Sequence, residues 1–460
     1  MSNPTILIVG TTDTKLDEIL YLRAQILAQG AYYQTKILDI SHTPAKSPAL
    51  GDIPSAEIVS PLLDQSSALK TLPRGEYIDK AIEICLPDVQ DLVSKSQIQG
   101  IVSAGGSSAS SLATALMRKA CPVGFPKLMV STMASGDIKH YIEETDITMM
   151  YSVVDIAGVN SILKRILSNA AAAIAAMTLS YSKSLLDPSK SEVKDKRIAI
   201  TMFGNTTPCV DQVRRILTST PHDVSEYEIY VFHATGAGGR AMERLIAERQ
   251  IDAVIDLTTT EIPDELFGGV LSAGPGRLEV AAKMGIPLVV SVGACDMVNF
   301  GPRDAVPEKC KDRKLIAHNP SVTLMRTTPE ENRQIGQFIA SKLTTHTTNP
   351  SVIRVLLPLG GVSMLDAPGK PFHDPDADNA LFESIEEGLE GSGIEIEKHL
   401  LNINDEQFAG HVASAILEVM GVSPRKYRLA NARRRKWSFD HGTTVMAARR
   451  NSLIEIPDAV

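Results

Sequence analysis

The sequence predicts an α/β protein built from two Rossmann-like lobes with mostly parallel sheets and a ligand cleft between them. Short aliphatic runs alternate with helical patterns, and the same order of elements occurs twice along the chain. Aromatic residues make up only 5% of the chain, while small and β-branched residues fill the apolar runs. Such runs are typical of parallel strands that are buried on both faces. The length of 460 residues also exceeds what one hydrophobic core normally fills.

The first lobe is predicted over residues 1–190. Its strands are expected at 6–9, 36–40, 100–104 and 127–131, and its helices at about 76–95 and 107–119. A segment rich in Pro, Ser and Ala, residues 41–75, follows the second strand and either reaches over a ligand or is a passive surface loop. A helix over about 159–181 leads into a polar stretch, so we place the lobe boundary near residue 190.

The second lobe is predicted over residues 191–423. Its strands are expected at 198–202, 229–232, 253–257, 288–292 and 352–358, and two closing helices near 379–390 and 405–420. The turn after Val9 resembles the turn after Phe203, because both continue with glycine and threonine. We interpret the two lobes as a diverged duplication. Residues 424–460 are predicted to form a basic extension that packs on the body or on a partner.

The composition excludes several classes of function. The formal net charge of -8 makes nucleic acid an improbable partner for the body of the protein, although Arg433–Lys436 forms a short basic run. The five cysteines are scattered and odd in number, which argues against a disulfide framework and for a reducing compartment. The N-terminal region lacks the pattern of a signal peptide, and Ile6–Val9 is too short to span a bilayer. We therefore expect a cytoplasmic protein with no membrane partner.

A glycine-rich turn at 233–243, HATGAGGRAME, is the most distinctive local motif. It follows a predicted strand and opens a helix, so its amides and the positive helix end suit a phosphate or carboxylate. The alternative is a turn that needs glycine only for tight packing, with a structural histidine. The residues that we predict to bind a ligand here are His233, Thr235, Gly236, Gly238, Gly239 and Arg240.

Other strand ends carry hydroxyl and glycine residues that suit ribose or phosphate recognition. The alternative for these positions is helix capping, and Asp13 in particular is equally a candidate N-cap. The predicted ligand residues in this group are Gly10, Thr11, Asp13, Thr14, Gly105, Gly106, Ser107, Thr206 and Thr259.

Glu261 and Asp296 follow predicted strands, where they could hold Mg²⁺ through oxygen ligands; a salt-bridged structural carboxylate is the alternative. Cys209 opens a predicted helix and could be a nucleophile, but we favour a small buried filler. No Walker-type run occurs, and Gly10 does not begin a dinucleotide fingerprint. The catalytic residues are therefore left unassigned.

Several long strings of the sequence resemble one family. They are GTTDTK at 10–15, VSTMASG at 130–136, TMFGNTTPCV at 201–210, FHATGAGGRAME at 232–243 and SVGACDMVNFGP at 291–302. With them, residues 1–420 resemble the N-terminal ATP-binding domain of the tomato mosaic virus resistance protein and its bacterial and fungal relatives. This resemblance implies a two-lobed domain that binds ATP with Mg²⁺ and forms a homodimer. It also implies a TIM-barrel domain in the plant members, so a separately encoded barrel partner is a hypothesis here.

Two functions from different classes remain open. The first is a nucleotide-binding module in which ATP and Mg²⁺ stabilise a dimer or a regulatory surface. The second is an enzyme that performs phosphoryl or acyl-group chemistry on a small acid, with Arg240 on the anion and Glu261 or Asp296 carrying metal or protons. A structural or nucleic-acid role would depend on the basic run in the extension.

Overall fold

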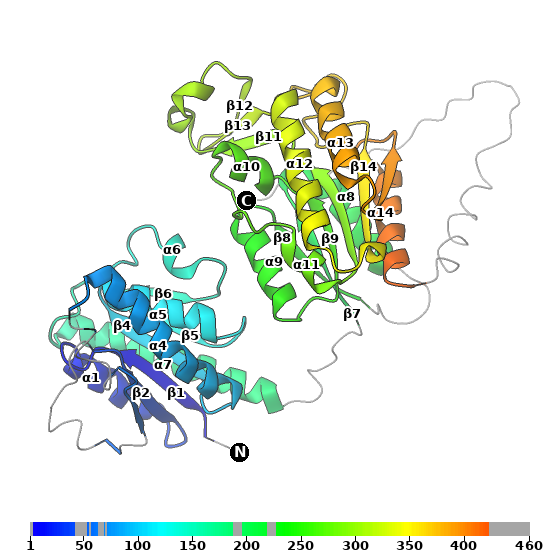
Figure 1. The fold of residues 1–460 in the computed structure, drawn as a ribbon. Coiled ribbons are helices and arrows are strands. Elements are labelled where there is room, and N and C mark those ends of the chain that lie inside the picture. The colour runs from blue at the N-terminus through cyan, green and yellow to red at the C-terminus, as the bar shows by residue number, and fades with distance from the viewer. Residues whose placement is uncertain are drawn as a thin grey trace, which may run out of the picture.

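The computed structural model describes residues 3–41, 53–54, 57–62, 69, 71–186, 196–218 and 227–422. Two α/β lobes follow one another along the chain (Figure 1). The predicted extension at 424–460, the junction at 187–195 and much of the insertion at 41–75 lie outside the described residues. The predicted fold class is confirmed, because each lobe contains a six-stranded sheet whose strands are all parallel.

The first lobe is built on a sheet with the strand order β3-β2-β1-β4-β5-β6. Its strands are β1 (Thr5–Gly10), β2 (Gln34–Asp39), β3 (Ile58–Val59), β4 (Gly100–Gly105), β5 (Lys127–Ser131) and β6 (Thr148–Tyr151). The aliphatic residues of β1 and β4 are fully buried, as expected for central strands covered on both faces. The short edge strands β3 and β6 were not predicted, since two to four residues carry little periodicity.

Helices cover both faces of this sheet and close two hydrophobic clusters. They are α1 (Leu16–Leu27), α4 (Arg74–Ser94), α5 (Ser107–Ala120), α6 (Lys139–Ile142) and α7 (Ser161–Leu186). One face packs against α1 and α7 and the other against α4 and α5. In α5, Leu112, Leu116 and the residues between them are buried.

By length and composition alone, α7 is apolar enough to cross a membrane, with a mean hydropathy of 1.3 over its best window. The helix nevertheless buries Leu163, Leu167 and Ile174 against the sheet of the first lobe. Its small residues, including Ala170 and Ala171, lie in the same cluster. This packing is that of a core helix in a globular lobe.

The second lobe has the strand order β15-β14-β10-β9-β7-β8. Its strands are β7 (Lys196–Met202), β8 (Tyr227–His233), β9 (Ala253–Thr258), β10 (Leu288–Gly293), β14 (Ile353–Pro358) and β15 (Glu395–His399). One face carries α8 (Thr207–Thr218) and α14 (Glu406–Val419). The opposite face carries α9 (Ala237–Ala247), α11 (Glu279–Met284), α12 (Pro329–His346) and α13 (Pro375–Leu389).

The two sheets share the order of five strands. In the first lobe this order is β2-β1-β4-β5-β6, and in the second it is β8-β7-β9-β10-β14. Because β1 and β7 each begin their lobe and have neighbours on both sides, the turns that follow them occupy equivalent places. The predicted match of strand order between the lobes is confirmed for these strands, which is consistent with a duplication.

A small antiparallel sheet lies beside the second lobe, near α10 (Glu261–Phe267), and was not predicted from the sequence (Figure 1). It contains β11 (Met297–Phe300), β12 (Leu315–Asn319) and β13 (Val322–Arg326). The amide of Asn299 donates to Asp264 Oδ1 at 2.7 Å, which ties β11 to α10. Burial raises the pKa of the Asp264 carboxyl to about 7. Proline and charged residues between β11 and β12 interrupt the apolar pattern, and this explains why the strands were missed.

Two arginines of α9 connect the lobes. Arg244 donates to the Thr145 hydroxyl at 2.6 Å and to the Cys121 carbonyl oxygen at 2.8 Å. Arg240 lies 3.6 Å from a carboxylate oxygen of Glu144. The contacted residues belong to the two loops that flank β5 in the first lobe. These contacts hold α9 against the first lobe close to α6.

Candidate functional site

The candidate site lies at the carboxyl ends of β1 and β4 in the first lobe. These strands are neighbours and pair in parallel, with Val9 opposite Ser103. The chain leaves β1 toward β2 on one side, whereas β4 lies on the other side, so a crevice forms between the turns that follow the two strands. The structure thereby brings together five of the predicted ligand residues: Gly10, Thr11, Gly105, Gly106 and Ser107.

The first turn of α5 is open to an anion. Its N-cap is Gly106, which has no side chain to satisfy the first amides of the helix, and its first turn contains no acidic residue. A Cβ placed on Gly106 would meet nothing closer than Thr132 Oγ1 at 3.8 Å, so the space beside this turn is free of close neighbours. Uncapped amides and the positive end of the helix dipole both favour a negatively charged ligand. By contrast, Gly105 is needed for packing, because its Cβ would collide with Ala109.

Arg74 adds a positive charge to this turn and was not identified from the sequence. It is the first residue of α4, and its Nε donates to Ser108 Oγ at 2.6 Å. The start of α4 is positioned by Tyr77, whose hydroxyl donates to the Ile40 carbonyl oxygen at 2.9 Å. Burial raises the pKa of Tyr77 to about 12, so it stays a neutral donor. No motif links residue 74 to residue 108, and only the packing of α4 on α5 reveals the pair.

The turn after β1 is organised by Asp39, which ends β2. Its carboxylate accepts hydrogen bonds from the amide and hydroxyl of Thr12 and from the amide and hydroxyl of Ser41. Such an acidic residue binds the ribose in many dinucleotide folds, but here its oxygens are engaged within the protein. Thr14 donates to the Thr11 hydroxyl at 3.0 Å. Asp13 is not the N-cap of α1, since that position is held by Lys15.

The glycine-rich turn of the second lobe does not have the geometry that we predicted. Glu261 Oε1 accepts hydrogen bonds from the amides of Gly236 at 2.6 Å and Gly239 at 3.0 Å. The carboxylate thus occupies the place where we expected a phosphate. A Cβ on Gly239 would lie 2.1 Å from Glu261 Oε2, and one on Gly238 would lie 1.9 Å from the His233 carbonyl oxygen. The glycines are therefore explained by close packing, and the alternative interpretation of this turn is supported.

Glu261 belongs to a buried cluster of charges around Arg277. The guanidinium donates to Glu261 Oε2 at 2.8 Å and to both oxygens of Asp256 at 2.5 and 2.6 Å, and Glu243 lies at 3.3 Å. Burial by itself lowers the pKa of Arg277, but Asp256 and Glu261 raise it well above its ordinary value. Arg277 and Glu261 are each only 1% exposed. The cluster is a structural one, and the metal role that we predicted for Glu261 is corrected.

The other predicted residues of the second lobe also make internal contacts. Arg240 donates to the Ser272 carbonyl oxygen at 3.1 Å and approaches Glu144 of the first lobe. Thr206 and Thr259 are fully buried; Thr206 Oγ1 lies 2.8 Å from Thr258 Oγ1, and Thr259 donates to the Ser291 carbonyl oxygen at 3.0 Å. Thr235 hydrogen-bonds back within its own turn, and His233 is exposed with its ring edge-to-face on Phe203.

Asp296 lies in a second buried cluster. Its Oδ2 accepts from the Ser363 hydroxyl at 2.8 Å, and it is fully buried near Arg326. Arg326 in turn contacts Asp378 at 2.7 Å and Asp366 at 3.8 Å. Burial raises the pKa of the Asp296 carboxyl to about 7. Within the described residues no group of three or more His, Cys, Asp or Glu side chains is placed to hold a metal ion, so the predicted metal role of Asp296 is corrected as well.

Cys209 is fully buried in the core on the α8 side of the second lobe. Burial raises the pKa of its thiol well above the ordinary range. A raised pKa suppresses the thiolate that nucleophilic catalysis needs. The interpretation of Cys209 as a small core residue is therefore supported.

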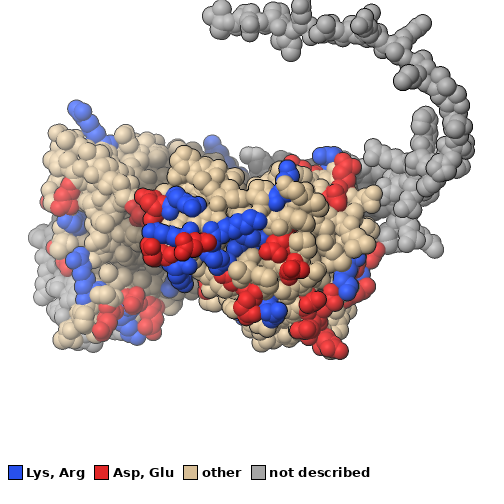
Figure 2. Space-filling view, turned by 90° about the horizontal axis from the view of Figure 1, so that it is seen from above, with Lys and Arg blue, Asp and Glu red and all other residues tan. Residues whose placement is uncertain are grey.

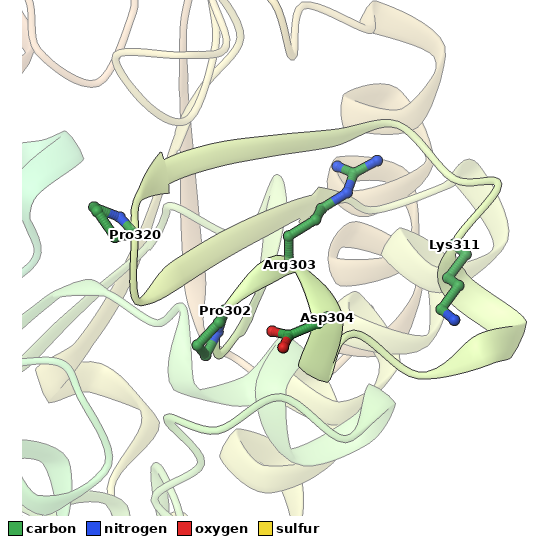
Figure 3. Close-up of a pocket in the computed structure, with 5 residues that line it drawn as sticks. All are labelled: Pro302, Arg303, Asp304, Lys311 and Pro320. Atoms are coloured by element: carbon green, nitrogen blue, oxygen red, sulfur yellow. The ribbon is translucent and has the colours of Figure 1, made fainter.

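A pocket of about 530 Å³ lies on the small antiparallel sheet, lined by Pro302, Arg303, Asp304, Lys311 and Pro320. Lys and Arg side chains gather with acidic ones on the face seen in Figure 2. In Figure 3, however, the guanidinium of Arg303 and the ammonium of Lys311 point to different places, and the Asp304 carboxylate lies apart from both. The charged groups do not converge on a common point, so this pocket is a weaker candidate than the edge of the first lobe.

The fold defines a two-lobed, Rossmann-like α/β protein in which the first lobe has an open helix end and the second has a self-filled one. The chain belongs to the Uncharacterised protein family (UPF0261): the N-terminal domain of that family matches residues 4–183 and the C-terminal domain matches residues 195–420. The resemblance inferred from the sequence motifs is thereby confirmed.

Two relatives illustrate the range of the family. A UPF0261 protein of Clostridium tetani is 42% identical over 423 residues, which cover 91% of this chain and 99% of the relative. The ToMV resistance protein Tm-1(GCR237) of Solanum lycopersicum is 37% identical over 435 residues, which cover 91% of this chain and 56% of that protein. The chain thus spans about half the length of the plant relative.

A putative UDP-N-acetylglucosamine 2-epimerase from Listeria monocytogenes is among the similar solved structures. It is 10% identical with a TM-score of 0.21, and the match covers 87% of this chain and all of that one. A likeness at this level carries no information about activity.

Proposed function

We propose that this protein binds ATP, or a closely related phosphorylated ligand, at the edge of its first lobe and acts as a binding or regulatory module. The observation that supports the proposal is the placement of Arg74 over the uncapped first turn of α5, through its contact with Ser108. A cation, a hydroxyl and open helix amides around one point form a complementary environment for phosphate oxygens. Among the predicted ligand residues, Gly106 and Ser107 are the ones that line this turn.

The division of roles between the lobes follows from their charges. In the first lobe the open turn has a guanidinium beside it and no acidic residue in its first helical turn. In the second lobe the equivalent amides already donate to Glu261. A phosphate would meet a carboxylate there, and the buried charge cluster would have to be broken to admit it. The ligand is therefore assigned to the first lobe.

Other parts of the proposal rest on the family resemblance. Mg²⁺ would arrive with the ATP phosphates and keep several of its water ligands, since it is commonly bound in this way. We also propose a homodimer, a cytoplasmic location and a separately encoded TIM-barrel partner. Co-purification with such a barrel protein and the mass of the protein in solution are the measurements that test them.

The enzyme alternative has no specific observation in its favour. It depended on Glu261 or Asp296 as a metal or proton carrier beside Arg240. Both carboxylates are buried and hydrogen-bonded inside the second lobe. A binding module needs neither of them.

Isothermal titration calorimetry of the full chain with ATP, with and without Mg²⁺, tests the proposal. We expect Arg74→Ala to weaken ATP binding about tenfold or more, since a charge-assisted hydrogen bond contributes about 1.5–3 kcal/mol. Arg74→Lys should retain part of the affinity. The matched control is Lys95→Ala at the other end of α4, whose side chain is 62% exposed and pairs with Asp91.

Arg240→Ala separates the two lobes. We expect it to leave ATP affinity unchanged, because Arg240 is engaged with Ser272 and Glu144. Loss of ATP binding in Arg240→Ala together with normal binding in Arg74→Ala would move the site to the second lobe. Absence of ATP binding by the unaltered chain would overturn the proposed function as a whole.

A further inference from the structure

Two large apolar side chains are exposed close to the open turn of α5. Tyr151 ends the edge strand β6 and is 42% exposed, and Met133 follows β5 and is 40% exposed. Most large apolar residues of the first lobe are buried in its two clusters. Exposed aromatic and thioether groups beside a ligand-binding edge are candidates for contact with a ligand rather than with the core.

Both residues lie on the side of the sheet that carries α5. Along β6 the side chains alternate, so that Met149 packs with the cluster of α4 and α5 whereas Met150 packs with that of α1 and α7. Tyr151 therefore projects to the same side as Met149. Ser131 Oγ, which lies 2.7 Å from Ser110 Oγ of α5, accepts a hydrogen bond from the Met133 amide at 3.0 Å.

The strand register places Tyr151 at a useful distance from the phosphate-binding turn. Gly105 pairs with Ser131, and Ser131 pairs with Tyr151. Because neighbouring strands are about 4.8 Å apart, Tyr151 lies about 10 Å along the sheet edge from Gly105. This separation matches a ligand that has an anionic group at one end and a planar ring at the other.

A strained turn fixes the end of β6. Val153 has a φ of +61°, which is rare for a β-branched residue and costs about 1–3 kcal/mol. The flanking residue Ser152 is held on both sides: its amide donates to the Ser131 carbonyl oxygen at 3.2 Å and its hydroxyl donates to the Val154 carbonyl oxygen at 2.7 Å. This turn holds Tyr151 beside β5 and so preorganises its ring.

Resting on the proposed function, we propose that Tyr151 and Met133 form the platform on which the base of the bound nucleotide lies. The phosphates then occupy the turn at Gly106 and Ser107, and the base extends across β5 to β6. Aromatic stacking tolerates any base, because every base has a planar face. The platform therefore selects nucleotides over simple phosphates without selecting strongly among bases.

Titration with ATP and with inorganic tripolyphosphate tests this inference separately from the proposed function. We expect Tyr151→Ala to weaken ATP binding about tenfold, the loss typical of one base-stacking contact, and to leave tripolyphosphate binding unchanged. Tyr151→Phe should bind ATP as the unaltered chain does. Arg74→Ala should weaken the binding of both ligands. Tyr32→Ala, which removes another tyrosine with 44% exposure from the same lobe, is the control and should change neither.

The outcomes can be told apart. If Arg74→Ala weakens both ligands but Tyr151→Ala leaves ATP affinity unchanged, the platform is wrong and the phosphate site stands. If Tyr151→Ala weakens tripolyphosphate as much as ATP, the residue supports the fold of the edge, and the platform is again wrong. If neither ligand binds the unaltered chain, the proposed function and the platform both fall.

Discussion

Glu261 accepts a hydrogen bond from the amide of Gly236 at 2.6 Å, and this contact decides how the glycine-rich turn of the second lobe is understood. A turn of this kind is a common anion-binding element, and here the anion is a side chain of the same protein. The carboxylate is balanced by Arg277 on its other side. The turn thus contributes to the stability of the second lobe.

Replacement of Glu261 by glutamine should strongly destabilise the protein. The neutral amide in Glu261→Gln would leave the buried Arg277 short of one negative partner, and breaking a buried pair costs about 3–5 kcal/mol. Urea denaturation of both proteins measures the difference. The control is Glu330→Gln, which removes an exposed pair with Arg333 and should cost less than about 1 kcal/mol. Equal stability of Glu261→Gln and the unaltered chain would contradict this account.

Gly239→Ala should also destabilise the second lobe. Its Cβ would lie 2.1 Å from Glu261 Oε2, so the carboxylate or the turn must move, at a cost of about 1–3 kcal/mol. Gly410→Ala in α14 is the comparison, because no atom lies within 4 Å of its added Cβ. Alanine has the higher helix propensity, so this variant should be as stable as the unaltered chain or slightly more stable. A thermal melt that ranks the two variants in the opposite order would refute the assignment.

The stability of the second lobe should fall as the pH rises above neutrality. Burial raises the pKa of the Asp296 carboxyl to about 7 and that of Asp378 to about 8. Both groups bind a proton more tightly in the folded state, so their contribution is complete below the unfolded pKa near 3.9 and is lost as the pH passes through about 7–8. The free energy of unfolding, measured at pH 6 and pH 9, should decrease by on the order of 2 kcal/mol. Asp378→Asn should flatten this dependence, and an unchanged slope in that variant would contradict the role of this carboxyl.

Arg244→Ala should loosen the contact between the lobes. The variant loses the bonds to Thr145 and to the Cys121 carbonyl oxygen, which join α9 to the first lobe. Hydrogen exchange measured by mass spectrometry should become faster in the loops that contain these residues. Arg214→Ala removes an exposed arginine of α8 that pairs with Asp211 and should leave exchange there unchanged. Equal exchange in both variants would show that other contacts hold the lobes.

Much of the fold could be predicted because it depends on local pattern. Buried parallel strands such as β4 and β9 appear as continuous aliphatic runs, and α5 and α14 have a clear helical period. The edge strands β3 and β6 are too short to show a pattern. The sheet of β11, β12 and β13 is held mainly by contacts with distant segments, which no local window contains.

The site was predicted less well, since its chemistry depends on which partners the fold brings together. The sequence of the turn at Gly236–Arg240 is that of an anion site, but nothing in it reveals that Glu261 fills the turn. In the same way, Arg74 is separated from Ser108 by a helix and a strand. The open turn at Gly106 was found because glycine and serine follow a strand directly, which is a local signal.

The covalent origin of the anion in the second lobe has a consequence for how the two halves respond to solution conditions. A tethered carboxylate cannot dissociate, so its turn is occupied at every concentration of metabolites. A free ligand, by contrast, stabilises only the state that binds it, in proportion to the logarithm of its concentration. Heating the protein in rising phosphate-ligand concentrations should therefore shift the melting of one half and leave the other where it was.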